Sequence, residues 1–323
     1  MTDLRAASPE LSTRRMCAAL GISRSWWHET TRAREPDGEA AALREAIERI
    51  VLAFPGYGYR RVTQALRREG RAVNAKRVLR VMREEALRCR TKRRPVVTTD
   101  SRHGLGRYPN RLRAQPVDGP NQAWVADLTS VRLPATFVYL ATILDAWSRR
   151  AVGWGLSRRI DTDLTLAALG RAIADRDPAP GLIHHSDHGV QYASTRYVAR
   201  LEAIGARISM AAVGNPYQNA MAESFFATLK REEVSLHDYR TFAEAEASLE
   251  HFIETVYNHK RLHSSLGYRP PSEFEDCWAA ERDDARFLED TTPPTLGRGP
   301  VTGVHPRVPR YPPAHVPPAA GGP

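Results

Sequence analysis

The order of strand-like and helix-like segments from residue 121 onward constrains the fold more than any other feature of this chain. Three runs rich in Val, Thr and aromatic residues follow one another with short breaks: QAWVADLTSVRL, FVYLATILDAWS and AVGWGLS. Such runs predict neighbouring antiparallel strands. Helix and strand then alternate, with a helix over 161–176, a strand over 181–187, a helix ended by Gly205, a strand over 206–211 and a helix from about Asn219.

This element order is that of an RNase H-like α/β domain with a mixed five-stranded sheet flanked by helices, which we expect over residues 119–276. Two of its strands carry acids. Asp127 lies inside the apolar run AWVADLTSV, where a carboxylate is costly unless something compensates it, and Asp187 ends a strand in IHHSDHG. If the two strands pair in the middle of the sheet, their carboxylates lie side by side and repel each other, and a divalent cation removes that repulsion.

A third acid follows in GNPYQNAMAESFFATLK, residues 214–230, which opens as a turn and becomes a helix. Met221, Phe225 and Leu229 share its buried face, whereas Glu223 lies on an adjacent edge with Lys230. Three carboxylates are hard oxygen ligands that suit magnesium or manganese, and no such set suits zinc. We therefore expect the two aspartates and Glu223 to form one catalytic and metal-binding site.

The positive charge of the chain is concentrated ahead of this domain. Residues 1–120 hold 26 Lys and Arg against 13 Asp and Glu, whereas the remainder of the chain carries a net −3. A nucleic acid is the polyanion that such a basic region most commonly binds, and a membrane surface is the weaker alternative.

Two all-α units with helix-turn-helix character occupy this basic region. In residues 1–35, LSTRRMCAALGISRSWWHE reads as a helix, a turn at Gly21 and a second helix capped by Ser23, although an ordinary helical hairpin has the same pattern. In residues 40–90, one helix ends at Gly70 and the next is capped by Asn74. Nearly all the charges on the outward face of the second helix are positive, which favours phosphate contact over a merely solvated face.

Residues 91–118 read as a basic linker that Pro and Gly interrupt, and a flexible spacer would not need so many cations. The side chains that we expect to contact DNA are Lys230 beside the acidic site, and Arg60, Arg61, Lys76, Arg77, Arg80, Lys92, Arg93 and Arg94.

The C-terminal region is expected to contain one long helix and a tail. Residues 241–275 read as an amphipathic helix that closes near Gly267 and is stopped by Pro270 and Pro271. Residues 290–323 are rich in proline and poor in large apolar side chains, which predicts disorder. Three widely spaced cysteines, no apolar leader and no apolar run of ~20 residues favour a cytoplasmic protein outside the membrane.

Six strings in order resemble the OrfB transposases of the insertion-sequence-three family, which have a retroviral-integrase-like DDE core: YGYRRV, KRVLRVMRE, WVADLT, HHSDHGVQY, NPYQNAMAESFF and YNHKRLHSSLGYRPPSEF. The resemblance runs from about Leu11 to Phe274, and Asp127, Asp187 and Glu223 fall on the DDE positions. Gln218 departs from the family, which usually has Asp there, and this affects the loop and not the triad.

The resemblance implies a bacterial insertion-sequence transposase that cuts DNA at the element ends and transfers the strands, using two Mg²⁺ or Mn²⁺ ions and no covalent protein intermediate. It also implies DNA partners, namely the terminal inverted repeats and the target, and a homo-oligomer that holds two ends. Members of the family commonly act as a fusion or complex with a small upstream helix-turn-helix protein. When bound to DNA, such a protein is associated with the nucleoid.

Two other functions fit parts of the pattern. A plain metal-dependent nuclease shares the fold, but the helix-turn-helix units and basic linker argue against it, and a DNA-binding protein that has lost catalysis would not need all three acids. Asp145 is expected either to be structural or to support the catalytic acids without joining them, and His184, His185 and His188 to form hydrogen bonds or lie near DNA. For YNHKRLHSSLG two interpretations stay open: packing of Tyr257 and Leu266, or DNA contact by Arg261 and His263.

Overall fold

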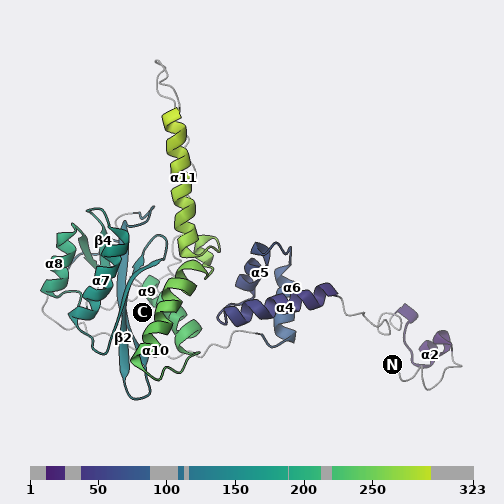
Figure 1. Ribbon diagram of the computed structural model, residues 1–323. Helices are drawn as coiled ribbons and strands as arrows, with labels where there is room; N and C mark the ends of the chain where they lie inside the picture. Colours follow the sequence, from purple (N-terminus) through teal and green to yellow (C-terminus); the bar gives the residue numbers. More distant parts are fainter. Residues whose placement is uncertain are drawn as a thin grey trace, which may run out of the picture. The chain divides into compact units, whose positions relative to one another are not determined.

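The computed structural model of this 323-residue chain describes residues 12–25, 38–87, 108–112, 116–187, 189–211 and 220–291 (Figure 1). The chain forms two compact units, residues 1–278 and 279–323. All elements described below lie in the first unit, except that helix α11 (Pro271–Thr291) runs across the boundary. None of the helices in the described ranges is both long enough and apolar enough to cross a bilayer.

Helix α2 (Thr13–Ala19) confirms the first predicted helix. The Ser12 hydroxyl caps it by accepting a hydrogen bond from the backbone N–H of Arg15. Gly21, with φ of +65°, makes the predicted turn, because glycine enters the left-handed region without a Cβ clash. The helix expected beyond Ser23 falls largely outside the described residues.

Three helices form the next unit: α4 (Gly38–Ala53), α5 (Tyr59–Arg68) and α6 (Ala75–Glu84). The Asn74 side chain caps α6 by accepting from the N–H of Lys76 at 2.8 Å, as the sequence predicts. The buried side chains of these three helices and of the loop between α4 and α5 form one core, which Leu262, a residue that follows η3 (His251–Tyr257), also enters. The core consists of Leu43, Ala46, Ile47, Ile50, Tyr57, Val62, Leu66, Val78, Met82 and Leu262. A distant part of the chain therefore completes the core of the helical unit.

The predicted mixed five-stranded sheet is confirmed. Its strands are β1 (Ala123–Arg132), β2 (Phe137–Asp145), β3 (Ala151–Ser157), β4 (Ile183–Ser186) and β5 (Arg207–Met210). They lie in the order β3-β2-β1-β4-β5, with β1–β2 and β2–β3 antiparallel and β1–β4 and β4–β5 parallel. The two strands that carry or precede the predicted catalytic aspartates, β1 and β4, are therefore central neighbours.

Helices cover both faces of the sheet (Figure 1). On one face α7 (Thr162–Arg176) and α8 (Thr195–Ala203) bury Leu169 and Tyr197 against Trp124 of the sheet. On the other face α9 (Ala220–Leu229) and α10 (Phe242–Glu250) pack on β1 to β3. Because both faces are covered, the first residues of β1, Ala123 to Ala126, are all buried and apolar, and the acid that follows them is conspicuous.

The region after α9 departs from the expected single long helix. Helix α9 continues as a π-helical segment, η2 (Lys230–Val234), and α10 continues as a second one, η3 (His251–Tyr257). A 3₁₀ turn, η4 (Ser264–Leu266), follows, and Gly267 adopts the expected left-handed conformation. Pro271 does not stop a helix as expected but begins α11, because the fixed φ of proline and its missing N–H suit the first helical position.

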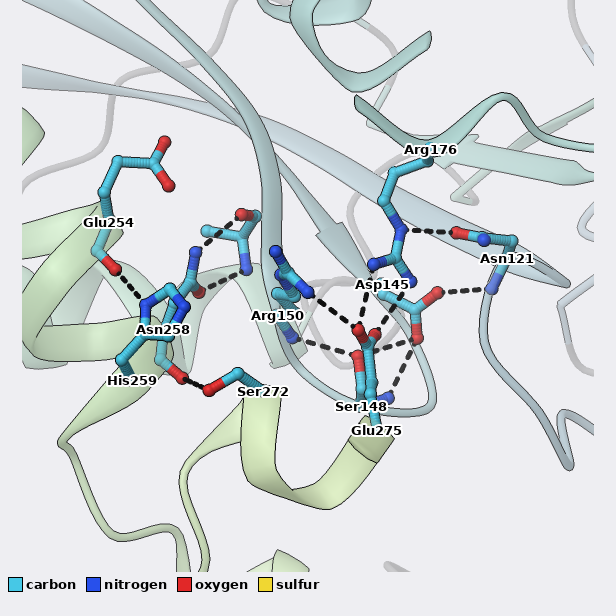
Figure 2. Close-up of polar contacts among 11 residues, drawn as sticks. Asn121, Asp145, Ser148, Arg150, Arg176, Glu254, Asn258, His259, Ser272 and Glu275 are labelled. Carbon is cyan, nitrogen blue, oxygen red and sulfur yellow. Dashed lines mark hydrogen bonds and ion pairs between the residues drawn. The ribbon is translucent and has the colours of Figure 1, made fainter. Parts of the chain in front are cut away.

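The segment from Tyr257 to Glu275 is a packing element, which decides between the two interpretations of YNHKRLHSSLG. Tyr257, Leu266, Arg261 and His263 are all buried, so the side chains of Arg261 and His263 do not face solvent where DNA could reach them. Figure 2 shows Asn258 bonded to both backbone groups of Ala151, accepting from its N–H at 2.9 Å and donating to its carbonyl at 3.0 Å. This side chain extends the edge of β3 as a further strand residue would.

Candidate active site

The sheet brings the two predicted catalytic aspartates together. The parallel register between β1 and β4 ends with Ala126 opposite Ser186, and Asp127 and Asp187 are the next residues on the two strands. Both side chains are half-buried. The order of the elements predicts this placement, because it makes β1 and β4 neighbours in the middle of the sheet.

The electrostatics of Asp127 report the crowding of acids at this edge. Burial raises the pKa of its carboxyl to about 7, and the charges of Asp187 and Glu223 add to the shift. The N–H of Leu128, which donates to Asp127 Oδ1 at 2.7 Å, and the charge of Lys230 oppose it. Asp127 therefore lies within electrostatic range of both other acids, and Lys230 offsets only part of their negative charge.

Glu223 lies in the first turn of α9, the helix that packs against β1, and its side chain is exposed. Within the described residues, no three His, Cys, Asp or Glu side chains are close enough to hold one metal ion. The structure thus pairs the aspartates and places the glutamate nearby, but it does not bring the three into one coordination shell.

The donor set nevertheless fits a hard divalent cation. Two adjacent carboxylates at a strand edge, one of them with a pKa raised to about 7 by burial and by its acidic neighbours, are stabilised when a cation neutralises them. Carboxylate oxygens are the ligands that Mg²⁺ and Mn²⁺ prefer, and no cysteine of the described residues lies among them.

Lys230 is half-buried at the start of η2, seven residues after Glu223. Burial lowers the pKa of its ammonium group, and the negative charge of Asp127 acts in the opposite direction. This cation therefore lies within electrostatic range of the acidic site, on the same side of the sheet as α9.

Tyr192 is a residue of this site that sequence reasoning missed. It is 2 % exposed, and its hydroxyl has no hydrogen-bond partner among the described residues. Burial raises the pKa of the phenol well above its usual range, and the charges of Tyr197, Asp127 and Asp187 add to this. The turn in which the Tyr192 N–H donates to the Gly189 carbonyl folds the ring back toward Asp187, whose Oδ1 accepts from the Gly189 N–H at 2.9 Å. The signal in the sequence was a tyrosine five residues after the aspartate in HHSDHGVQY.

The neighbouring histidines have structural roles. His184 Nε2 lies 3.0 Å from the Tyr197 hydroxyl, and His185 Nδ1 lies 2.8 Å from Ser209 Oγ. Burial, together with a smaller effect of the nearby His185, lowers the pKa of His184 to about 3. The expectation of hydrogen-bonding roles is confirmed for these two, whereas His188 lies outside the described residues.

The structural role expected for Asp145 is also confirmed (Figure 2). Its carboxylate is fully buried and accepts from the N–H groups of Asn121, Trp147 and Ser148 at 2.7 to 2.9 Å. Beside it, Glu275 accepts from both Arg150 and Arg176, which ties the start of α11 to the turn between β2 and β3 and to the end of α7. Asp145 thus holds together the turn that follows β2, and its carboxylate bonds to that turn and to Asn121.

The predicted DNA-contacting cations of the helical unit divide into two kinds. Arg60, Lys76 and Arg80 are exposed, and Arg77 is half-buried and paired with Glu39 at 2.9 Å. Arg61 instead turns inward, and its Nε donates to the Leu262 carbonyl at 3.0 Å. DNA contact by Arg61 would require this bond to break. Lys92, Arg93 and Arg94 lie outside the described residues.

Comparison with known families assigns most of the chain. Residues 117–216 and 204–271 match integrase core domains, and residues 39–95 match an HTH-like domain. The boundaries coincide with the sheet-containing domain and with helices α4 to α6. The two domain types together indicate a protein that binds DNA.

Curated relatives are similar over most of their length. The transposase for insertion sequence element IS904 of Lactococcus lactis is 37% identical over 239 residues, 73% of this chain and 94% of the relative. Transposase InsF for IS3A of Escherichia coli K12 is 34% identical over 273 residues, 83% and 95% of the two chains. Among solved structures, a simian T-cell lymphotropic virus intasome chain is 17% identical with a TM-score of 0.42, covering 77% of each chain.

Proposed function

Because the chain belongs to the IS3 family of bacterial insertion-sequence transposases, which implies polynucleotidyl transfer, we propose that it cleaves and joins DNA strands with Asp127, Asp187 and Glu223. The observation that carries this assignment is the juxtaposition of Asp127 and Asp187 where β1 pairs with β4, with the charges of Asp187 and Glu223 both acting on the Asp127 carboxyl. Perturbed carboxylates of this kind cluster at catalytic sites.

The three acids are the residues that would hold divalent metal, Mg²⁺ or Mn²⁺ and by family analogy two ions. When bound, the metal supplies Lewis-acid stabilisation of charge at the phosphate. Glu223 has to close on the aspartates for this, which is consistent with the loose geometry that catalytic groups often have before substrate binds.

Other side chains of the site act on the DNA and on the acids. Lys230, within electrostatic range of Asp127, places a cation where it can hold a terminal phosphate. The Tyr192 hydroxyl, a buried donor without a partner among the described residues, would donate to a carboxylate or a phosphate oxygen once DNA and metal are bound. The Gly189 N–H keeps the Asp187 carboxylate in place.

The reaction balances without any other reactant than water. In cleavage, the water oxygen bonds to phosphorus, the bond to the 3′ oxygen breaks, and that oxygen leaves as a 3′-OH. In joining, the 3′-OH attacks a second phosphate, so that one phosphodiester bond forms for each one that breaks. The joining step therefore needs no nucleotide cofactor.

The partners follow from the same proposal. The exposed cations Arg60, Lys76 and Arg80, with Arg77, would read the terminal inverted repeats from the HTH-like unit, while the integrase core would engage the repeat ends and the target. Two ends per event require a homo-oligomer on the DNA, acting at the nucleoid of a bacterial cell. A small upstream helix-turn-helix protein is the further partner that the family suggests.

The test is a joining assay on labelled duplexes that carry the two ends of the element. Asp187→Asn should slow both cutting and joining by at least ~1,000-fold, about 4 kcal/mol of transition-state stabilisation, because it removes one charge from the acidic site. Asp163→Asn is the matched control, since Asp163 is exposed on α7 and should leave both rates unchanged. Cutting without joining by the wild type would favour the plain nuclease, and joining by Asp187→Asn at the wild-type rate would refute the assignment.

A further inference from the structure

The helical unit α4 to α6 is bonded to the segment that follows η3. The Tyr57 hydroxyl, 1 % exposed as a residue, accepts from the N–H of Leu262 at 2.7 Å, and Arg61 donates to the carbonyl of the same residue. Leu262 itself lies in the core of the helical unit. Leu262 of the integrase core thus bonds to the HTH-like unit through both of its backbone polar groups and packs against it through its side chain.

A buried ion pair lies directly beneath this contact. Arg261, 2 % exposed, donates to Glu232 through Nε at 2.7 Å and through a terminal nitrogen at 2.8 Å. Burial acts to raise the pKa of Glu232, but the hydrogen bonds and charge of Arg261 outweigh it, so the pKa is lowered. The pair is therefore ionised and bidentate, the geometry that best offsets the cost of burying two charges.

Gly56 of the helical unit packs on this pair. A Cβ at Gly56 would lie 2.5 Å from both Cδ and Oε1 of Glu232, closer than atoms approach in proteins. Because Arg261 fixes the carboxylate of Glu232 at both oxygens, the side chain cannot move aside without breaking the pair. The absence of a side chain at residue 56 is thus what allows the helical unit to dock.

Glu232 belongs to the element that carries the catalytic helix onward. It lies on η2, which continues α9 without a break, two residues after Lys230. The terminal nitrogen of Arg261 also reaches Thr228 Oγ1 of α9 at 3.5 Å. π-helical turns are frequent at functional sites, and this one joins the docking contact to the helix whose Glu223 does not share a coordination shell with the aspartates.

We propose that the contact formed by Gly56, Tyr57, Glu232, Arg261 and Leu262 is a coupling site through which end binding by the HTH-like unit positions α9, and with it Glu223 and Lys230. This proposal rests on the catalytic role of Glu223 given above. The HTH-like unit then contributes to the rate of strand cleavage as well as to affinity for the element end, and the residues of the contact are positioning residues.

The experiment compares two glycine variants of the full-length chain on a labelled duplex carrying one element end. Gly56→Ala pushes against Glu232, whereas the matched control Gly58→Ala adds its Cβ to open space. Gly56→Ala should bind the end duplex within about threefold of the wild type and lower kcat for cleavage by about 5- to 150-fold, the usual size of a coupling between sites. Gly58→Ala should match the wild type in both.

Hydrogen exchange supplies a readout that a merely structural contact would not change. End binding should slow amide exchange over residues 220–234 in the wild type and in Gly58→Ala, and leave it unchanged in Gly56→Ala. Tyr57→Phe, which removes only the acceptor for the Leu262 N–H, should show the same defect in milder form. It decides the matter if Gly56→Ala does not fold.

The outcomes separate the coupling from the proposed function. If the wild type neither cuts nor joins the end duplex with Mg²⁺ or Mn²⁺, the proposed function fails. If the wild type is active while Gly56→Ala and Tyr57→Phe cleave at its rate, or lose activity only in proportion to lost DNA binding, the coupling is refuted and the contact serves stability alone.

Discussion

At the scale of single residues, the pairing of polar atoms separates the titratable groups that serve structure from those proposed to serve chemistry. His184 and Asp145 have their polar atoms satisfied inside the protein, by the Tyr197 hydroxyl in one case and by backbone N–H groups in the other. Asp127 has one such bond and two acidic neighbours, and its pKa is raised to about 7. A buried group that lacks compensation is the one that marks the site.

The histidine carries a pH prediction. The pKa of His184 is lowered to about 3 in the folded chain, so between the unfolded value of about 6.5 and pH 3 the unfolded state binds the extra proton, and stability is lost as the pH falls through this window. From pH 7.5 to 5.5 this amounts to about 1.4 kcal/mol. His184→Gln should remove that amount from the pH dependence of the unfolding free energy measured by urea denaturation. Exposed His251→Gln should leave this pH dependence as in the wild type. An unchanged slope in His184→Gln would contradict the burial argument.

At the scale of elements, close packing of α7 on β3 positions the sheet. A Cβ at Gly153 of β3 would lie 2.8 Å from Ala172 Cβ and 2.9 Å from its backbone nitrogen, and it would also meet the Ala168 carbonyl. The helix approaches the strand this closely only because residue 153 has no side chain. Gly170, on α7 itself, meets nothing within 4 Å in the same test and gives a matched comparison.

The two glycines should respond to alanine with opposite signs. Gly153→Ala overpacks the helix against the strand and should destabilise the fold by about 1–3 kcal/mol. Gly170→Ala removes a flexible residue from a helix interior and should stabilise it by about 0.5–1 kcal/mol. Thermal unfolding of the two variants measures both. Equal melting temperatures would show that α7 does not approach β3 as closely as described.

Element prediction from the sequence succeeded where local patterns decide and failed where tertiary contacts do. The strands and helices of the core follow from apolar runs and glycine turns, and the Asp127–Asp187 pairing follows from their order. Helix α4 has an apolar stripe that was readable but was not assigned, and Pro271 was misread as a stop. The π-helical segments η2 and η3 have no sequence signal, because their hydrogen bonding depends on what packs against them. The separation of Glu223 from the two aspartates depends on how α9 packs against the sheet, and no local sequence pattern encodes that packing.

At the scale of the whole molecule, the proposed function places DNA reading and strand chemistry in different domains, which a buried contact joins alongside the exposed Arg68–Glu273 ion pair. The HTH-like unit and the integrase core meet through Leu262, Arg261 and Glu232, residues whose spacing in the sequence gives no sign of proximity to Gly56 or Tyr57. If the proposed coupling holds, this contact makes strand cleavage depend on binding of the element end by the HTH-like unit.

The central claim is that Asp127, Asp187 and Glu223 share divalent metal when an element end is bound. The most direct measurement is anomalous diffraction at the manganese edge from crystals of the full-length chain with Mn²⁺ and an end duplex. We expect manganese to be coordinated by oxygens of all three side chains, with α9 closed toward β1 and β4. Manganese bound elsewhere, or bound by the aspartates while Glu223 stays exposed on the assembled complex, would contradict it.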